Sequence, residues 1–359
     1  MSALTTRQFA AQQGDKLLRS LSTQIARTIR SLEERAQVTS PGPAERAVSP
    51  IFGAGSGGSR ARGVNEVHDL RVAIRRFMRV LVVLKPCFPR GESRRIRRSL
   101  KRIMVHAGSV RDHDVSMGVL GKMAIPHPGP TEAGGTGPKG SGPATIAQQL
   151  RDRREGEAGI LLACLQRWVE RNLPSAWRKA LKAGAENENG GSGTDDARFC
   201  NTRAETMATR ILPEMAEEHF RCGADAAQEN ASVKEIHSFR IAARNLRYTL
   251  DLFAPMYGTA LAGLLDQLKD VQSLLGDLND CATVRRILHR LKTSKQKGGK
   301  EVLTALRKRQ RRKNEQFRAH YAAEFANAAT LRLWKTSLRD VGGRARTRKR
   351  PPARRTSAA

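Results

Sequence analysis

Hydrophobic residues recur along most of the chain every three or four positions, which is the spacing of one face of an α-helix. Single alternation of apolar and polar residues, which is typical of strands, is almost absent. The periodic stretches are rich in Leu, Ala, Arg, Glu and Lys, residues that favour helices. Segments rich in Gly, Pro and Ser separate them, at about 40–63, 126–143 and 184–195. The pattern therefore predicts an all-α protein with flexible loops.

One motif occurs twice and divides the chain into two halves. Residues 68–75 read His-Asp-Leu-Arg-Val-Ala-Ile-Arg, and residues 237–244 read His-Ser-Phe-Arg-Ile-Ala-Ala-Arg. Each half also has an earlier and a later helical segment, about 8–36 and 147–182 in the first half and about 203–225 and 302–339 in the second. We therefore expect two four-helix bundles, 8–182 and 198–340, related by a pseudo-twofold axis and forming one domain.

The repeated helix carries a row of basic residues opposite its apolar face. At about 100° per residue, one face of the first copy holds His68, Arg71, Arg75 and Arg79. The matching face of the second copy holds His237, Arg240, Arg244 and Arg247. A single row of this kind is most simply a solvated helix face. These rows, however, largely lack acidic partners four residues away, so their like charges repel one another unless an anion joins them.

The helix that follows each repeated helix adds further candidates at matching places. Lys101 and Lys269 are its repeated lysines, and Gly108 and Gly276 allow a close helix approach or a helix break. Asp112 and Asp280 follow each glycine at the same distance. We expect these two carboxylates to orient an arginine or a histidine rather than to catalyse a reaction.

The charge balance points to a polyanionic partner. The 359 residues include 65 Lys and Arg against 34 Asp and Glu, a formal charge of +31. Aromatic residues make up only 4%, which disfavours binding by base stacking. Residues 341–359 form a basic, Pro-containing segment, which predicts a disordered arm able to bind any polyanion.

Other kinds of site have little support in the sequence. The five cysteines are scattered and form no C-x-x-C pair, so we expect no metal site and no disulfide framework. Gly53, Gly55 and Gly58 match a dinucleotide-binding spacing, but no strand precedes them, so no cofactor is expected. Without a signal-type segment or a long apolar run, the chain is expected to be intracellular and not inserted in a membrane.

The doubled His-x-x-Arg-[Val/Ile]-Ala-x-Arg helix, followed by a lysine-containing helix with Gly-x-x-[Arg/Asn]-Asp, resembles the CHAD family, the conserved histidine α-helical domain. The resemblance covers roughly residues 8–340. It implies two four-helix bundles whose basic residues line a central pore or groove that binds inorganic polyphosphate. It also implies an association with polyphosphate granules in the bacterial cytoplasm.

Carried over position by position, the resemblance nominates His68, Arg71, Arg75, Lys101, Arg111, His237, Arg240, Arg244, Arg247 and Lys269 as polyphosphate-binding residues. Met78 stands where a basic residue is more usual, and the neighbouring Arg79 is the candidate to replace it. Arg244 replaces a residue that is commonly lysine and keeps its charge. The chain lacks the Glu-x-Glu-x-Lys signature of the triphosphatase domain that some relatives carry, so no enzymatic role is expected.

Two other functions stay open on the sequence. The high positive charge also suits a nucleoid-associated or RNA-binding protein that acts on the phosphate backbone. A phosphohydrolase requires carboxylates gathered around a metal ion, and Asp112 and Asp114 are the main candidates.

Overall fold

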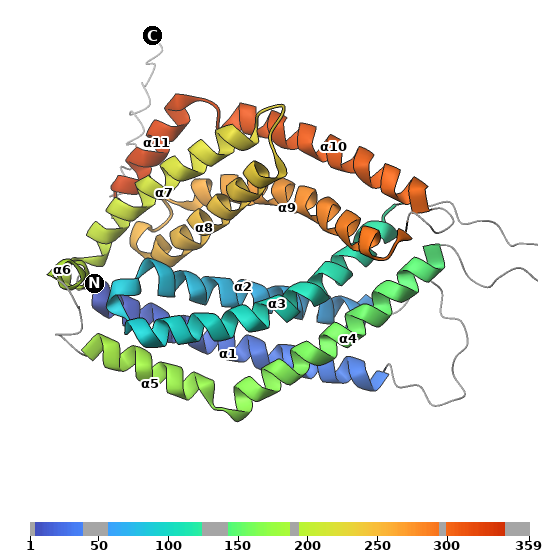
Figure 1. Ribbon diagram of the computed structural model, residues 1–359. Helices are drawn as coiled ribbons and strands as arrows, with labels where there is room; N and C mark the ends of the chain where they lie inside the picture. Colours follow the sequence, from blue (N-terminus) through green and yellow to red (C-terminus); the bar gives the residue numbers. More distant parts are fainter. Residues whose placement is uncertain (1–3, 39–56, 124–142, 187–193, 294–298, 342–359) are drawn as a thin grey trace, which may run out of the picture.

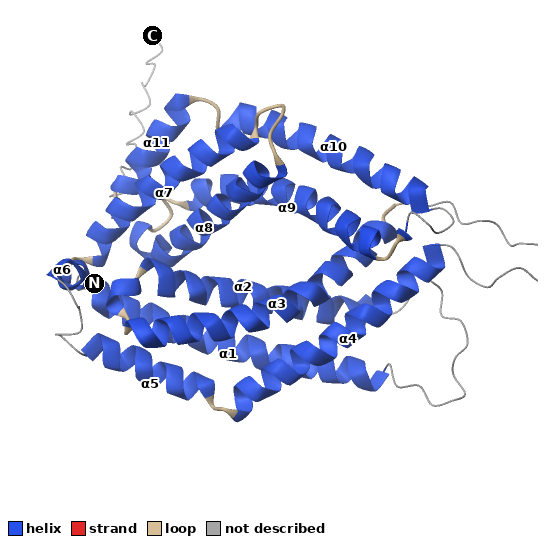
Figure 2. Ribbon diagram, in the orientation of Figure 1, coloured by secondary structure: helices blue, strands red, loops and turns tan. Residues whose placement is uncertain are grey.

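The fold consists of helices joined by short turns, as Figure 2 shows, and the described residues contain no strand beyond one isolated bridge between Thr5 and Arg203. The all-α prediction is therefore confirmed. The computed structural model describes residues 4–38, 57–123, 143–186, 194–293 and 299–341. Most of the predicted linker at 40–63, most of the predicted loop at 126–143 and nearly all of the predicted basic arm lie outside these residues.

The helices fall into two groups that follow the two halves of the sequence (Figure 1). The first group comprises α1 (Thr6–Val38), α2 (Gly57–Val83), α3 (Arg90–Gly121), α4 (Pro143–Glu170) and α5 (Leu173–Glu186). The second comprises α7 (Ala204–Ala226), α8 (Val233–Tyr257), α9 (Ala262–Arg290), α10 (Gly299–Glu324) and α11 (Ala328–Arg339). A short 3-10 helix, η1 (Lys85–Cys87), follows α2, and α6 (Thr194–Asn201) leads into the second group.

The last segment of each half, expected as one helix, is two helices. In the first half the chain turns at Asn172, whose φ of 45° lies in the left-handed region that asparagine tolerates. In the second half the side chain of Asn327 accepts a hydrogen bond from the Ala329 N–H at 2.8 Å and starts α11. Apart from the short helices η1 and α6, each half thus has five α-helices among the described residues, one more than predicted. In addition, α2 begins at Gly57, inside the segment expected to be a linker.

A capping box fixes the start of α8, the second copy of the repeated helix. The Ser232 hydroxyl accepts a hydrogen bond from the Glu235 N–H at 3.2 Å, and the Glu235 carboxylate accepts one from the Ser232 N–H at 2.6 Å. This pair satisfies two backbone donors that have no partner within the helix. It places His237 in the next turn at a defined position.

The two halves meet along two apolar contacts. In the larger core, Phe9 of α1 stacks on Phe253 of α8 with ring centroids 5.4 Å apart. In the smaller core, Leu120 and Ile146 from the first half pack with Leu288 and Leu303 from the second. Helix α2 contacts α8 and α3 contacts α9, so the repeated helices face one another (Figure 1). A pseudo-twofold axis relating the halves stays a prediction.

Buried aromatic and sulfur-containing residues fill the core. Trp168, Trp177 and Trp334 are buried, and the first two meet edge to face at 6.0 Å. Four of the five cysteines are buried, and Cys164 is partly buried. The thiols of Cys87 and Cys200 are 3.0 Å apart, which brings η1 and α6 together.

A buried histidine lies in the aromatic core of the second half. His219 has no exposed surface, and its ring lies 4.8 Å from Phe239 and 6.0 Å from Trp334 between centroids. Neither ring nitrogen has a hydrogen-bond partner among the described residues. Burial lowers the pKa of His219 to about 3, because the charged imidazolium has no solvation there. The ring is therefore neutral at pH 7.

We expect His219 to make the fold sensitive to acid. Its pKa is lower in the folded state than the ordinary 6.5, so the unfolded chain binds the additional proton as pH falls from about 6.5 towards 3. The free energy of unfolding therefore falls by about 1.4 kcal/mol for each pH unit below 6.5, which amounts to about 2 kcal/mol by pH 5. Denaturant unfolding at pH 7 and at pH 5 measures this effect. Between the two pH values, the unfolding free energy of His219→Leu should fall by about 2 kcal/mol less than that of the parent.

The exposed His289 supplies the control, because His289→Leu should lose as much stability as the parent over the same interval. An equal loss in the parent and in His219→Leu would contradict the prediction.

Candidate anion-binding site

Five arginines from three helices lie together where the two halves face one another. They are Arg71 and Arg75 of α2, Arg111 of α3, and Arg240 and Arg244 of α8, and we call them the arginine cluster. All five are partly buried. On α3, Arg111 lies between residues of the larger core and Leu120 of the smaller one, so apolar packing between the halves holds the cluster from both ends.

The electrostatic effects of these side chains on one another show how closely they lie. Burial, followed by the charge of Arg75, lowers the pKa of Arg71 and of Arg244 to about 10. The same two causes, in the same order, lower the pKa of Arg240. Arg75 therefore acts on arginines of both halves. All of these groups keep their charge at pH 7, so the cluster is a concentration of repelling, partly desolvated cations.

The cluster arginines have no neutralising partners of their own. Among the described residues, none of the five forms a hydrogen bond or an ion pair within 4 Å, and the Nε–H of Arg240 is buried without an acceptor. A buried donor without a partner costs about 1–3 kcal/mol. An oxyanion placed among these groups would supply the missing acceptors and the missing negative charge.

A glycine makes room for one member of the cluster. A Cβ at Gly108 would lie 2.8 Å from Nη1 of Arg71, so the guanidinium of Arg71 rests directly on the backbone of α3. At Gly276, the matching position of α9, a Cβ would meet nothing within 4 Å. Neither glycine breaks its helix. The expected close approach therefore occurs at Gly108, where it involves a side chain, and not at Gly276.

Two carboxylates lie among the arginines. Oδ2 of Asp112 accepts a hydrogen bond from Nη2 of Arg286 at 3.3 Å, across the contact between α3 and α9. The charge of Asp112 also raises the pKa of Arg71 and of Arg240, against the effect of burial. Burial raises the pKa of Asp280, and the charge of Arg111 opposes that rise. Arg286 was missed by the sequence reasoning, because its partner comes from the other half.

Two predicted binding residues instead make contacts within the protein. Nε of Arg79 donates to the Thr249 hydroxyl at 2.7 Å, across the contact between α2 and α8. Nη1 of Arg247 donates to the side-chain oxygen of Gln272 at 2.8 Å. Each of these two arginines therefore has one acceptor within the protein, although the Nε–H of Arg247 is buried without one. No sequence signal distinguishes them, because Thr249 and Gln272 meet them only in the folded chain.

The predicted histidines and lysines differ in their surroundings. Burial and the charge of Arg111 lower the pKa of His68, and burial and the charge of Arg240 lower the pKa of His237. Both rings therefore lie at the edge of the cluster and are mainly neutral at pH 7. Lys101 is exposed, and Lys269 forms an exposed ion pair with Asp266 at 2.7 Å. Neither lysine shares an ion-pair partner with the cluster.

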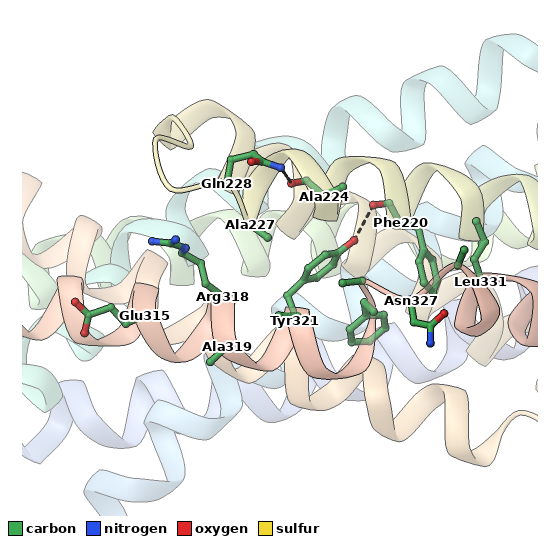
Figure 3. A pocket seen from close by; sticks show the side chains of 14 residues that line it. Phe220, Ala224, Ala227, Gln228, Glu315, Arg318, Ala319, Tyr321, Asn327 and Leu331 are labelled. Atoms are coloured by element: carbon green, nitrogen blue, oxygen red, sulfur yellow. Dashed lines mark hydrogen bonds between the residues drawn. The ribbon is translucent and has the colours of Figure 1, made fainter.

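The described residues of the second half line two pockets considered as candidate sites. One, of about 750 Å³, lies between α7, α10 and α11 and is lined mainly by alanine and aromatic side chains (Figure 3). The hydroxyl of Tyr321 donates there to the Phe220 carbonyl at 2.9 Å, and none of the predicted binding residues lines this pocket. The other, of about 340 Å³, lies between α8, α9 and α10 and has His237 and Arg240 in its wall.

Within the described ranges, no three His, Cys, Asp or Glu side chains come together as metal ligands. None of the helices in that part of the chain combines the length and the apolar character needed to cross a bilayer.

Comparison with known proteins gives the class and then the family. The chain is similar in fold to the crystal structure of the CHAD domain from the plant Ricinus communis, with a TM-score of 0.51 and 16% sequence identity over 92% of each chain. The family model of the CHAD domain matches residues 57–289, which run from the start of α2 to the end of α9 and include the whole arginine cluster. The chain belongs to the CHAD domain family. No curated protein matches its sequence.

We expect the cluster to reduce the stability of the protein when no anion is bound. Arg75→Gln removes the charge that acts on arginines of both halves and keeps a good helix former. At low ionic strength it should raise the free energy of unfolding by about 0.5–1 kcal/mol, since each like-charge contact costs a few tenths. Urea unfolding measures this change, which should shrink at about 1 M salt, where charges are screened within about 3 Å.

The control is Arg98→Gln on the exposed face of α3, which should change the unfolding free energy by less than about 0.5 kcal/mol. A destabilised Arg75→Gln protein would show that the arginine has an acceptor and is not repelled.

Proposed function

We propose that this protein binds inorganic polyphosphate at the arginine cluster. The observation that carries the proposal is that five arginines from both halves lie together with no acidic side chain within ion-pair distance of any of them. A guanidinium presents two parallel N–H donors to two phosphate oxygens, and each charge-assisted bond of this kind contributes more than a neutral one. The ligand supplies the acceptors that the protein does not.

The arrangement suits a linear anion better than a single phosphate. Arg71 and Arg75 on α2, like Arg240 and Arg244 on α8, are four residues apart, a rise of about 6 Å along each helix. A phosphate chain that runs along these rows contacts several arginines at once, and helices of both halves contribute to the same ligand. The CHAD family membership and the low aromatic content of 4% also favour a phosphate chain without bases.

We further propose that the protein binds polyphosphate without hydrolysing it and that it associates with polyphosphate granules in the cytoplasm. Hydrolysis with a metal ion requires carboxylates free to hold the metal. Asp112 already accepts a hydrogen bond from Arg286, and burial raises the pKa of Asp280. Release of orthophosphate in the presence of magnesium or manganese, lost on changing Asp112 or Asp280, would contradict this part of the proposal.

Nucleic acid is the second candidate ligand. The observation that favours it is the exposed face of α3, where Arg94, Arg98 and Arg102 point to solvent with no ion-pair partner among the described residues. Such a face binds any phosphate backbone through release of counterions. The two candidates thus predict different arginines: those of the cluster for polyphosphate and those of the exposed face for nucleic acid.

We expect the cluster arginines to be required for polyphosphate binding. The variant Arg71→Gln, Arg75→Gln, Arg240→Gln and Arg244→Gln should weaken binding of long-chain polyphosphate at least about 100-fold at near-physiological salt, since each charge-assisted bond contributes about 1.5–3 kcal/mol. The matched control removes four charges from exposed positions: Arg94→Gln, Arg98→Gln, Arg102→Gln and Arg312→Gln. It should weaken polyphosphate binding by less than about tenfold, through long-range attraction alone.

Titration with labelled polyphosphate measures the affinity of both variants, after circular dichroism has shown that each is folded. If the two variants lose the same affinity for polyphosphate, the ligand is held by general electrostatic attraction and not at the arginine cluster. Duplex DNA that displaced polyphosphate from the parent protein at equal phosphate concentration would favour nucleic acid as the ligand.

A pair of glycine variants tests the geometry of the site without changing its charge. Gly108→Ala puts a methyl group 2.8 Å from Nη1 of Arg71, closer than a Cβ normally lies to another atom, so the guanidinium must shift from its present position. We expect polyphosphate affinity to fall about five- to tenfold. One misplaced charged hydrogen bond costs about 1 kcal/mol or more, which corresponds to a loss of this size.

Gly276→Ala is the control, because its methyl group points into open space. Both variants gain the same helix propensity, about 1 kcal/mol, so a difference in affinity reports only on Arg71. Unchanged affinity in Gly108→Ala would show that Arg71 does not touch the ligand.

A further inference from the structure

The pocket of about 340 Å³ between α8, α9 and α10 has a strongly basic wall. Four arginines line it, Arg240, Arg285, Arg307 and Arg311, together with His237, and no acidic side chain does. Arg311 forms only an exposed ion pair with Glu315 at 3.8 Å, which neutralises it weakly. The pocket is therefore a concave surface of positive charge, and only Arg240 belongs to the arginine cluster as well.

Several polar atoms at this pocket are buried without a partner. Nη1 of Arg285 donates to Gln310 at 2.7 Å, but its Nε–H and that of Arg240 have no acceptor among the described residues. The side-chain oxygen of Asn314 is likewise buried with no donor. Two buried donors and one buried acceptor thus lack partners in the wall of one pocket. A ligand that offers acceptors to the two N–H groups and a donor to the oxygen would satisfy all three atoms.

The rest of the wall is apolar. Val233, Ile236, Leu275 and Leu278 line the pocket on the sides of α8 and α9. A volume of about 340 Å³ lies at the lower end of the range for small-molecule sites, about 300–1,000 Å³. Inorganic phosphate would use the arginines and leave the apolar surface exposed to water. A ligand that uses the whole pocket has an anionic end, an uncharged body and an N–H or O–H group.

We propose that this pocket binds a small organic phosphate of the nucleotide kind. Its phosphates contact the arginines of α9 and α10, its body covers the leucines of α9, and one of its N–H or O–H groups donates to the side-chain oxygen of Asn314. This site goes beyond polyphosphate binding and does not depend on it, since three of its four arginines lie outside the arginine cluster. The two sites share Arg240 and the neighbouring His237.

Calorimetric titration of the full-length protein with ATP and with inorganic triphosphate tests the proposal, because the two probes carry similar charge and only ATP has a body. Inorganic triphosphate is also a short polyphosphate that the arginine cluster would bind, so the comparison counts only the binding that the pocket-filling variant Ala282→Phe removes. For that binding we expect ATP to be at least about tenfold tighter than triphosphate, because ATP buries apolar surface and pairs Asn314. Equal affinities, or no binding of ATP at millimolar concentration, would overturn the proposal.

The matched variants lie side by side on α10. Arg307→Gln with Arg311→Gln removes two charges from the pocket wall, whereas Lys308→Gln with Arg312→Gln removes two charges from the next, exposed positions. We expect the first pair to weaken ATP binding at least about tenfold and the second by less than about threefold. Equal effects would mean that ATP is attracted by the general charge of the helix, against the proposal.

A variant that fills the pocket separates this site from the polyphosphate site. Ala282→Phe adds a ring to the pocket wall and changes no charge, so it should abolish ATP binding and leave polyphosphate affinity unchanged. ATP binding that survived this substitution would overturn the pocket as the site. If the cluster variant loses polyphosphate binding and Ala282→Phe keeps it, the two proposals can be tested separately.

Discussion

The free energy of bringing like charges together is the constraint on which this structure depends. Five arginines are partly buried where the two halves face one another, and they repel. No ion pair within 4 Å offsets that repulsion among the described residues, and Asp112 and Asp280 reduce it only from a greater distance. Apolar packing between the halves, at Phe9 with Phe253 and at Leu120 with Leu288, holds them in place. The fold thus holds these cations close together at a cost in its own stability.

Some arginines outside the cluster have an acceptor on a neighbouring helix. Arg79 bonds to Thr249, Arg247 to Gln272, and the buried Arg154 to Asp114 at 3.0 Å. These arginines hold helices together, because each has an acceptor on a different helix. The same residue type therefore joins helices at these places and lies without an acceptor in the cluster. Arg285 combines the two situations, because its Nη1 donates to Gln310 while its Nε–H is buried without an acceptor.

The two proposed sites meet at Arg240. Arg240 is partly buried and lies close to Arg75. It also lines the pocket between α8, α9 and α10, so it belongs to both sites. Polyphosphate and a small organic phosphate would therefore compete for one guanidinium while using different residues on either side. This geometry gives the second half a binding surface that the repeat does not predict, because Arg285 and Arg307 have no part in the repeated motif.

The sequence determined the helical class, the repeated helix and the direction of its arginine row, because these follow from spacing along one helix. It placed Arg71, Arg75, Arg240 and Arg244 on the faces that the structure brings together. It did not determine the breaks at Asn172 and Asn327, where a local turn overrides helical periodicity.

Only the tertiary structure decided which arginines keep free donors, which glycine makes room for one of them, and that Arg286 reaches Asp112. These facts depend on contacts between residues more than 20 positions apart, which no local pattern records. Spacing along the chain sets where a side chain points, but the acceptor it meets there belongs to another helix.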